Sequence, residues 1–65
     1  MSTSPEQRRA NLFCGRGGPH DAEWLYRYEK RLGILTDDLA LSPEELSAAI
    51  KIATDEADAW EAAQP

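Results

Sequence analysis

The sequence predicts a small all-α domain with a short N-terminal helix, a middle helix and a longer C-terminal helix. Three observations favour this fold class. Ser-Pro-Glu helix starts occur at Ser4 and again at Ser42. Hydrophobic residues recur at helical spacing in the middle and C-terminal segments, and a glycine-rich break separates the first two helices. Because the chain has 65 residues, we expect one domain over 1–65, with frayed ends at 1–4 and 64–65.

The first helix should begin at Ser4, whose hydroxyl can accept from a backbone N–H of the first turn. Gln7 lies three residues later, in the position that completes a capping box. The helix should end at about Phe13 or Cys14. The loop that follows, 15–19, lacks the GxxxxGK[ST] and GxGxxG spacings of phosphate-binding loops, so we interpret it as a turn between helices.

The middle helix should span about His20 to Leu32, with Gly33 as the left-handed residue that ends it. Its inward stripe is predicted to contain Leu25, Tyr28, Leu32 and then Leu35, with Trp24 beside Tyr28. The linker after it is more aliphatic than an exposed loop, so we expect it to be packed. Thr36 could cap a single helical turn over 36–39.

The C-terminal helix should begin with a capping box formed by Ser42 and Glu45, and it should end near Ala62 or Ala63. Its core stripe is predicted to contain Leu46, Ile50, Ala53, Ala57 and Trp60. A second apolar strip lies off this stripe: Ala48, Ile52, Ala59 and Ala63. Either alanine is used here because it is the best helix former, or the strip is a seam for a second chain.

Self-contained chemistry is not expected, because Cys14 and His20 are the only cysteine and the only histidine. One cysteine excludes a disulfide within the chain, and two soft ligands fall short of the four that a zinc site needs. A symmetric dimer could in principle assemble such a site. A Cys–His nucleophile would also need an orienting group and a cleft, so we expect no enzyme and no cofactor.

A cytoplasmic location is expected for this chain. Its N-terminal residues lack the apolar segment of a signal peptide, and no apolar run approaches the ~20 residues that span a bilayer. The single thiol fits a reducing compartment. The Ala-, Arg-, Asp- and Glu-rich composition would suit a high-GC bacterium or its phage.

The charges are unevenly distributed along the chain. Residues 1–35 hold six Lys and Arg against four Asp and Glu, whereas residues 36–65 hold one Lys against eight Asp and Glu. An acidic, amphipathic C-terminal helix favours a protein–protein interaction module that docks on a partner protein or on a second copy. It could also imitate DNA, as an accessory or inhibitor protein. The candidate contact residues are Ile52, Asp55, Glu56, Ala59 and Trp60.

The alternative is a small nucleic-acid-binding regulator that uses the basic and aromatic residues of the first half. Its candidate contact residues are Arg8, Arg9, Arg16, Arg27, Lys30 and Arg31. Against it, Arg27 is spaced to pair with Glu23. The third helix, which would be the recognition helix of a helix-turn-helix, is acidic where arginines would be expected. We therefore do not favour nucleic-acid binding.

Overall fold

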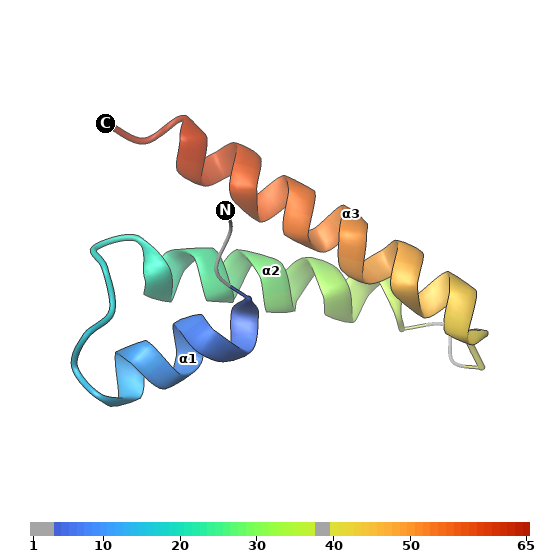
Figure 1. The fold of residues 1–65 in the computed structure, drawn as a ribbon. Coiled ribbons are helices and arrows are strands. Elements are labelled where there is room, and N and C mark those ends of the chain that lie inside the picture. Colours follow the sequence, from blue (N-terminus) through green and yellow to red (C-terminus); the bar gives the residue numbers. More distant parts are fainter. Residues whose placement is uncertain (1–3, 38–39) are drawn as a thin grey trace.

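Three helices form the fold, and the middle helix separates the other two (Figure 1). The computed structural model describes residues 4–37 and 40–65, with α1 at Pro5–Phe13, α2 at Asp21–Leu35 and α3 at Pro43–Ala62. α3 runs back across α2, and α1 packs on the opposite side of α2. The predicted all-α fold with a short, a middle and a longer helix is confirmed. None of the helices in the described ranges combines the length and the hydrophobicity that a membrane-spanning segment needs.

The two predicted serine caps are present. The Ser4 hydroxyl accepts from the Gln7 backbone N–H at 3.2 Å. Ser42 and Glu45 form the full capping box, in which each side chain accepts from the other residue's backbone N–H at 3.1 Å. The predicted box at α1 is only half formed, because the Gln7 side chain donates to Asn11 at 2.9 Å.

The predicted end of the middle helix at Gly33 is wrong, because α2 continues to Leu35. Its C-cap is Thr36, whose hydroxyl donates to the Leu32 carbonyl at 2.8 Å. Thr36 therefore ends α2, and the single helical turn predicted over 36–39 includes residues 38–39, which lie outside the described ranges. The expected packing of the linker is met in part: Leu35 and Leu41 are half-buried, Ile34 is exposed, and residues 38–39 lie outside the described ranges.

The core lies between α2 and α3 and is built around Trp24. This indole is fully buried and stacks on Tyr28, with ring centroids 5.4 Å apart, as their i, i+4 spacing predicts. Its N–H donates to the Asp58 carboxylate at 2.9 Å, so the buried donor is satisfied. Leu32 and Trp60 pack against the edge of this cluster.

Alanines provide the α3 side of the core, which corrects the predicted stripe. Ala53 is 0% exposed and Ala57 1%, as expected, but Ala49 joins them and the larger Leu46 and Ile50 do not. Leu46 remains 43% exposed and Ile50 39%. Small side chains let two helix backbones approach closely, and the bulky Trp24 then fills the space between them.

A buried arginine connects all three helices. Arg8 of α1 is only 8% exposed, and its guanidinium pairs with Asp21 at the start of α2. It also pairs with both carboxylate oxygens of Glu61 on α3, at 2.9 and 3.1 Å. The guanidinium lies 4.4 Å from the Trp24 ring centroid, within cation–π range. α1 is thus attached to α3 by one long side chain.

Candidate functional site

The predicted contact residues of α3 lie on or beside one exposed strip. Ile52, Asp55 and Ala59 are exposed, whereas Trp60 is half-buried. The predicted second apolar strip is also exposed along its length, at Ala48, Ile52, Ala59 and Ala63. Of the candidate residues, Glu56 and Trp60 turn toward α2, where they line a hollow in the surface.

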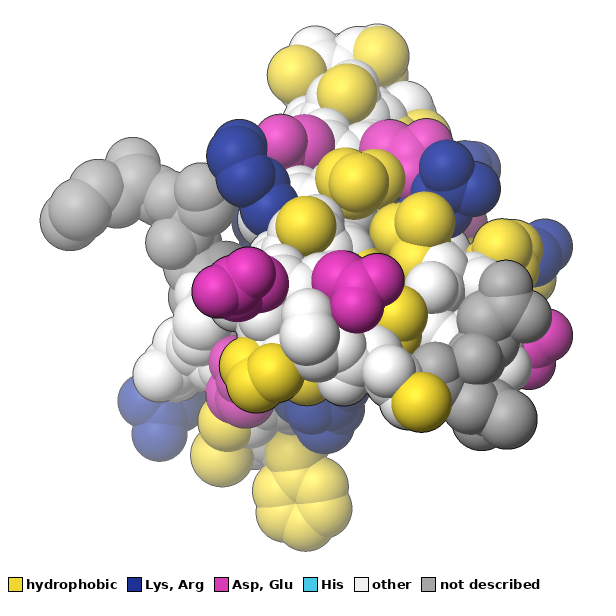
Figure 2. Space-filling view, turned by 90° about the vertical axis from the view of Figure 1, so that its right-hand side faces the viewer, with side chains coloured by type: hydrophobic (Ala, Val, Ile, Leu, Met, Phe, Trp, Pro, Cys, Tyr) yellow, Lys and Arg dark blue, Asp and Glu magenta, His cyan; other side chains and the backbone are white. Residues whose placement is uncertain are grey.

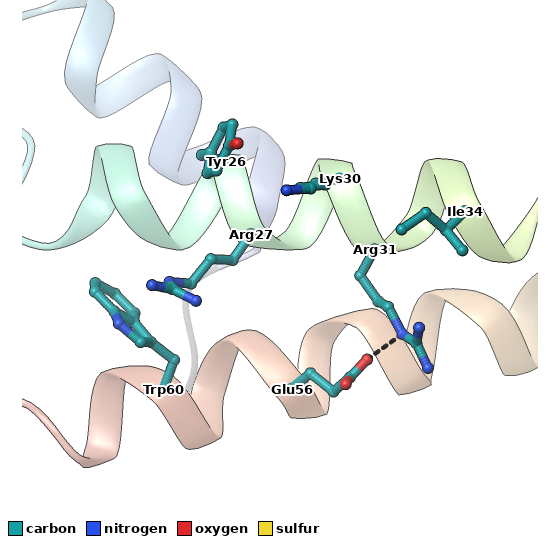
Figure 3. A pocket seen from close by; sticks show the side chains of 7 residues that line it. All are labelled: Tyr26, Arg27, Lys30, Arg31, Ile34, Glu56 and Trp60. Atoms are coloured by element: carbon teal, nitrogen blue, oxygen red, sulfur yellow. Dashed lines mark ion pairs between the residues drawn. The ribbon is translucent and has the colours of Figure 1, made fainter.

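The hollow lies between α2 and α3 and has a volume of about 470 Å³ (Figure 3). Its walls combine aromatic, aliphatic and cationic side chains with a single carboxylate: Tyr26, Arg27, Lys30, Arg31, Ile34, Glu56 and Trp60. Figure 3 shows Arg27 extending from α2 toward Trp60 of α3, and Arg31 toward Glu56. Volumes of this order hold a small ligand or a few side chains of a partner.

Three of the lining residues come from a strip of α2 that was not among the candidate protein-contact residues. Tyr26, Lys30 and Ile34 recur at intervals of four, so they lie above one another on the helix. The Lys30 ammonium lies 5.7 Å from the Tyr26 ring centroid. This regular spacing could have been read from the sequence, but only the packing of α2 on α3 places the strip beside Trp60.

Trp60 is held in place by two contacts from the α2 side. The Arg27 guanidinium lies 4.9 Å from its ring centroid, and the His20 ring meets it edge-on at 5.8 Å and 88°. Arg27 itself pairs with Glu23 at 3.1 Å, which confirms the predicted i, i+4 ion pair. The orientation of Trp60 at the hollow is therefore fixed by its neighbours before any partner arrives.

Large hydrophobic residues remain exposed on α2 and α3. Figure 2 views the molecule from the end where α2 connects to α3 and shows hydrophobic side chains in a broken band between acidic and basic ones. Ile52 is 43% exposed, and Ile34 and Tyr26 are each 59% exposed. Ile52 lies one turn before Glu56 on α3, so it adjoins the hollow that Ile34 and Tyr26 line.

Most residues of the predicted basic cluster are engaged in ion pairs. Besides the buried Arg8, Arg9 pairs with Glu29, and Arg31 pairs with Glu56 across the hollow. Burial alone would lower the pKa of Arg8, but the hydrogen bonds and negative charges of Glu61 and Asp21 outweigh it and raise this pKa. Arg8 is therefore buried in the fold and cannot contact a nucleic acid. Arg16 and Lys30 have no ion pair within residues 4–37 and 40–65.

Cys14 and His20 lie on either side of the glycine-rich loop. Cys14 is exposed, and His20 packs on Trp60. The Gly18 N–H at the end of the loop donates to Asp21 at 2.8 Å, so this donor is used within the fold. In the described part of the chain, no three potential metal ligands of the His, Cys, Asp or Glu type are grouped together.

Comparison of the chain with protein-family models, with curated proteins and with solved structures found no match.

Proposed function

We propose that this chain is a non-enzymatic protein–protein interaction module that docks through a face shared by α2 and α3. This docking face consists of the hollow together with Ile52, Asp55 and Ala59 on the adjoining strip of α3. It extends the contact surface predicted from the sequence by the Tyr26, Lys30 and Ile34 strip of α2.

The observation that carries the proposal is that small side chains of α3 fill the core while larger hydrophobic side chains remain exposed. Three alanines occupy the core on the α3 side, while the larger Ile52, Ile34 and Tyr26 of the docking face are 43%, 59% and 59% exposed. Burying a large aliphatic side chain stabilises a protein by roughly 1.5–3 kcal/mol, so a fold that serves stability alone would place such residues inward. Their outward position supports a role in contact with another molecule.

A second support is the preorganised aromatic residue. Trp60 is half-buried and held by Arg27 and His20, so little conformational entropy would be lost when a partner packs against its open part. Aromatic side chains held in this way commonly carry much of the binding energy of an interface. The partner is either another protein or a second copy of this chain.

The test compares two aspartate substitutions at exposed hydrophobic positions. Ile52→Asp changes the docking face, and Phe13→Asp makes the same change at a position on α1 that is 93% exposed. Both variants should retain the circular dichroism spectrum of the unmodified chain. The unmodified chain, crosslinked in cells of its source, should capture a partner that Phe13→Asp also captures and Ile52→Asp loses. Retention of every partner by a folded Ile52→Asp would refute this face.

Light scattering decides between the two kinds of partner. If the partner is a second copy, the purified chain should be a dimer or larger at high concentration, and Ile52→Asp should be a monomer. If the purified chain is a monomer throughout, the partner is a different protein.

A further inference from the structure

The cations in the hollow are crowded on one side of α2. Arg27, Lys30 and Arg31 occupy positions i, i+3 and i+4, a spacing at which like charges face one another and repel. Among the described residues, Glu56 is the only carboxylate that lines the hollow. The hollow is therefore positively charged on a chain whose net charge is −5.

These cations keep hydrogen-bonding capacity for a further acceptor. Nε makes the shortest contact in both the Arg27–Glu23 and the Arg31–Glu56 ion pair. A guanidinium has five N–H donors, and one carboxylate engages only part of them. The side chains of both arginines remain more than two fifths exposed. Lys30 has no ion pair in the described part of the chain.

The apolar walls lie within reach of the cations. Tyr26 and Ile34 flank Lys30 along α2, and Trp60 lies beneath Arg27 (Figure 3). A ligand that fits must therefore bring an acidic group and a hydrophobic group side by side. Guanidinium groups bind carboxylates in a two-pronged geometry, and the rings and Ile34 provide apolar contact area.

We infer that the hollow binds a peptide segment of a partner protein in which aspartate or glutamate stands next to a hydrophobic side chain, an inference that rests on the docking function proposed above. Charge complementarity favours such a segment over a nucleic acid. Glu23 and Glu56 flank the cations, and the second half of the chain is strongly acidic. A long polyanion would meet that negative charge on both sides, whereas a short segment with one or two carboxylates reaches only the cations.

The experiment is a selection from a displayed library of random peptides on the immobilised full chain. We expect the retained peptides to be enriched in aspartate or glutamate beside a leucine, isoleucine or aromatic residue. A synthetic peptide of the enriched sequence should shift the backbone amide resonances of residues 26–34 and 56–60. Replacing its acidic residues by their amides should weaken binding about tenfold, the effect of losing one charge-assisted hydrogen bond.

Two lysine variants of the chain provide the matched comparison. Lys30→Gln should weaken binding of the selected peptide by about tenfold, whereas Lys51→Gln should not, because neither Lys51 nor its ion-pair partner Asp55 lines the hollow that binds the peptide. The inference is overturned if the selected peptides are neutral or basic, if none is retained, or if both lysine variants lose affinity equally. It is also overturned if a DNA duplex displaces the peptide from the hollow, or if the unmodified chain is a dimer and Lys30→Gln converts it to a monomer. If any of these results is obtained while Ile52→Asp still loses its partner, the inference about the peptide is refuted and the proposed docking function is retained.

Discussion

The Arg8 guanidinium lies over the buried Trp24 ring, 4.4 Å from its centroid, and pairs at the same time with carboxylates of α2 and α3. Arginine suits this position because its planar group can stack on a ring through its face while it donates through its edge. α1 has only nine residues, too few to be stable alone in water. Its attachment to the rest of the fold therefore depends largely on this side chain.

Removal of this guanidinium should destabilise the whole domain. Arg8→Met keeps much of the side-chain volume but leaves Asp21 and Glu61 without their cation. Breaking a buried ion pair from one side costs about 3–5 kcal/mol, and the partial exposure of both carboxylates reduces the expected loss to about 2–3 kcal/mol. Urea unfolding followed by circular dichroism measures it.

The control for that variant is Arg9→Met, which removes a more exposed pair with Glu29. Its unfolding midpoint should stay close to that of the unmodified chain, because exposed ion pairs are screened by water and salt. Equal midpoint shifts in the two variants would mean that the buried network contributes no more than a surface pair.

Replacement of Gly33 should stabilise the protein. Gly33 lies inside α2, and a Cβ atom built on it meets nothing within 4 Å. Gly33→Ala should therefore add about 0.5–1 kcal/mol, because alanine loses less backbone entropy than glycine when the helix forms. Thermal unfolding should show a higher Tm. Gly15→Ala is the opposing control: Gly15 has a φ of 76°, where an L side chain is strained, so this variant should lower the Tm. A lower Tm for Gly33→Ala would show that α2 does not continue through this residue in solution.

The helices could be predicted from the sequence wherever a local signal decides. Ser4 and Ser42 act as caps through atoms only three residues away, so no tertiary contact is needed to recognise them. Gly33 shows the limit of such signals. A glycine ends a helix only when the chain turns there, and the packing of Leu32 and the Thr36 cap instead carry α2 three residues past Leu32, almost one full turn.

The site was harder to predict than the helices. Ile52, Glu56 and Trp60 on α3 were candidate contact residues, although the helical period also placed Trp60 in the core stripe. Their position beside Tyr26, Lys30 and Ile34 depends on how α2 and α3 are rotated against each other. That rotation is set by the buried contacts of Trp24 with Arg8 and Asp58, which join residues 16 and 34 positions apart. No helical repeat contains such long-range pairs.

The corrected register of α3 can be tested by two substitutions on adjoining faces. Ala53→Leu should destabilise the domain by about 1–3 kcal/mol, because Ala53 is 0% exposed and the added atoms would force α2 and α3 apart. Ile50→Ala should cost less than about 1.5 kcal/mol, because Ile50 is 39% exposed, whereas a truncated core isoleucine costs about 2–5 kcal/mol. Guanidinium unfolding measures both. If Ile50→Ala lowers the free energy of unfolding by as much as a core truncation, the core stripe predicted from the sequence is favoured over the core of Ala49, Ala53 and Ala57.

Tyr28 should make the protein sensitive to alkaline pH. Its burial, and then the negative charge of Glu6, raise the pKa of the Tyr28 phenol above its ordinary value of about 10. The unfolded chain therefore loses this proton at a lower pH than the folded one. The stability that depends on the neutral phenol is complete below pH of about 10 and is lost as the pH rises toward the raised pKa. Urea midpoints measured at increasing alkaline pH should fall for the unmodified chain and fall less for Tyr28→Phe, which keeps the ring stacked on Trp24 but cannot ionise. Parallel pH dependence in the two proteins would show that some other group causes the alkaline loss.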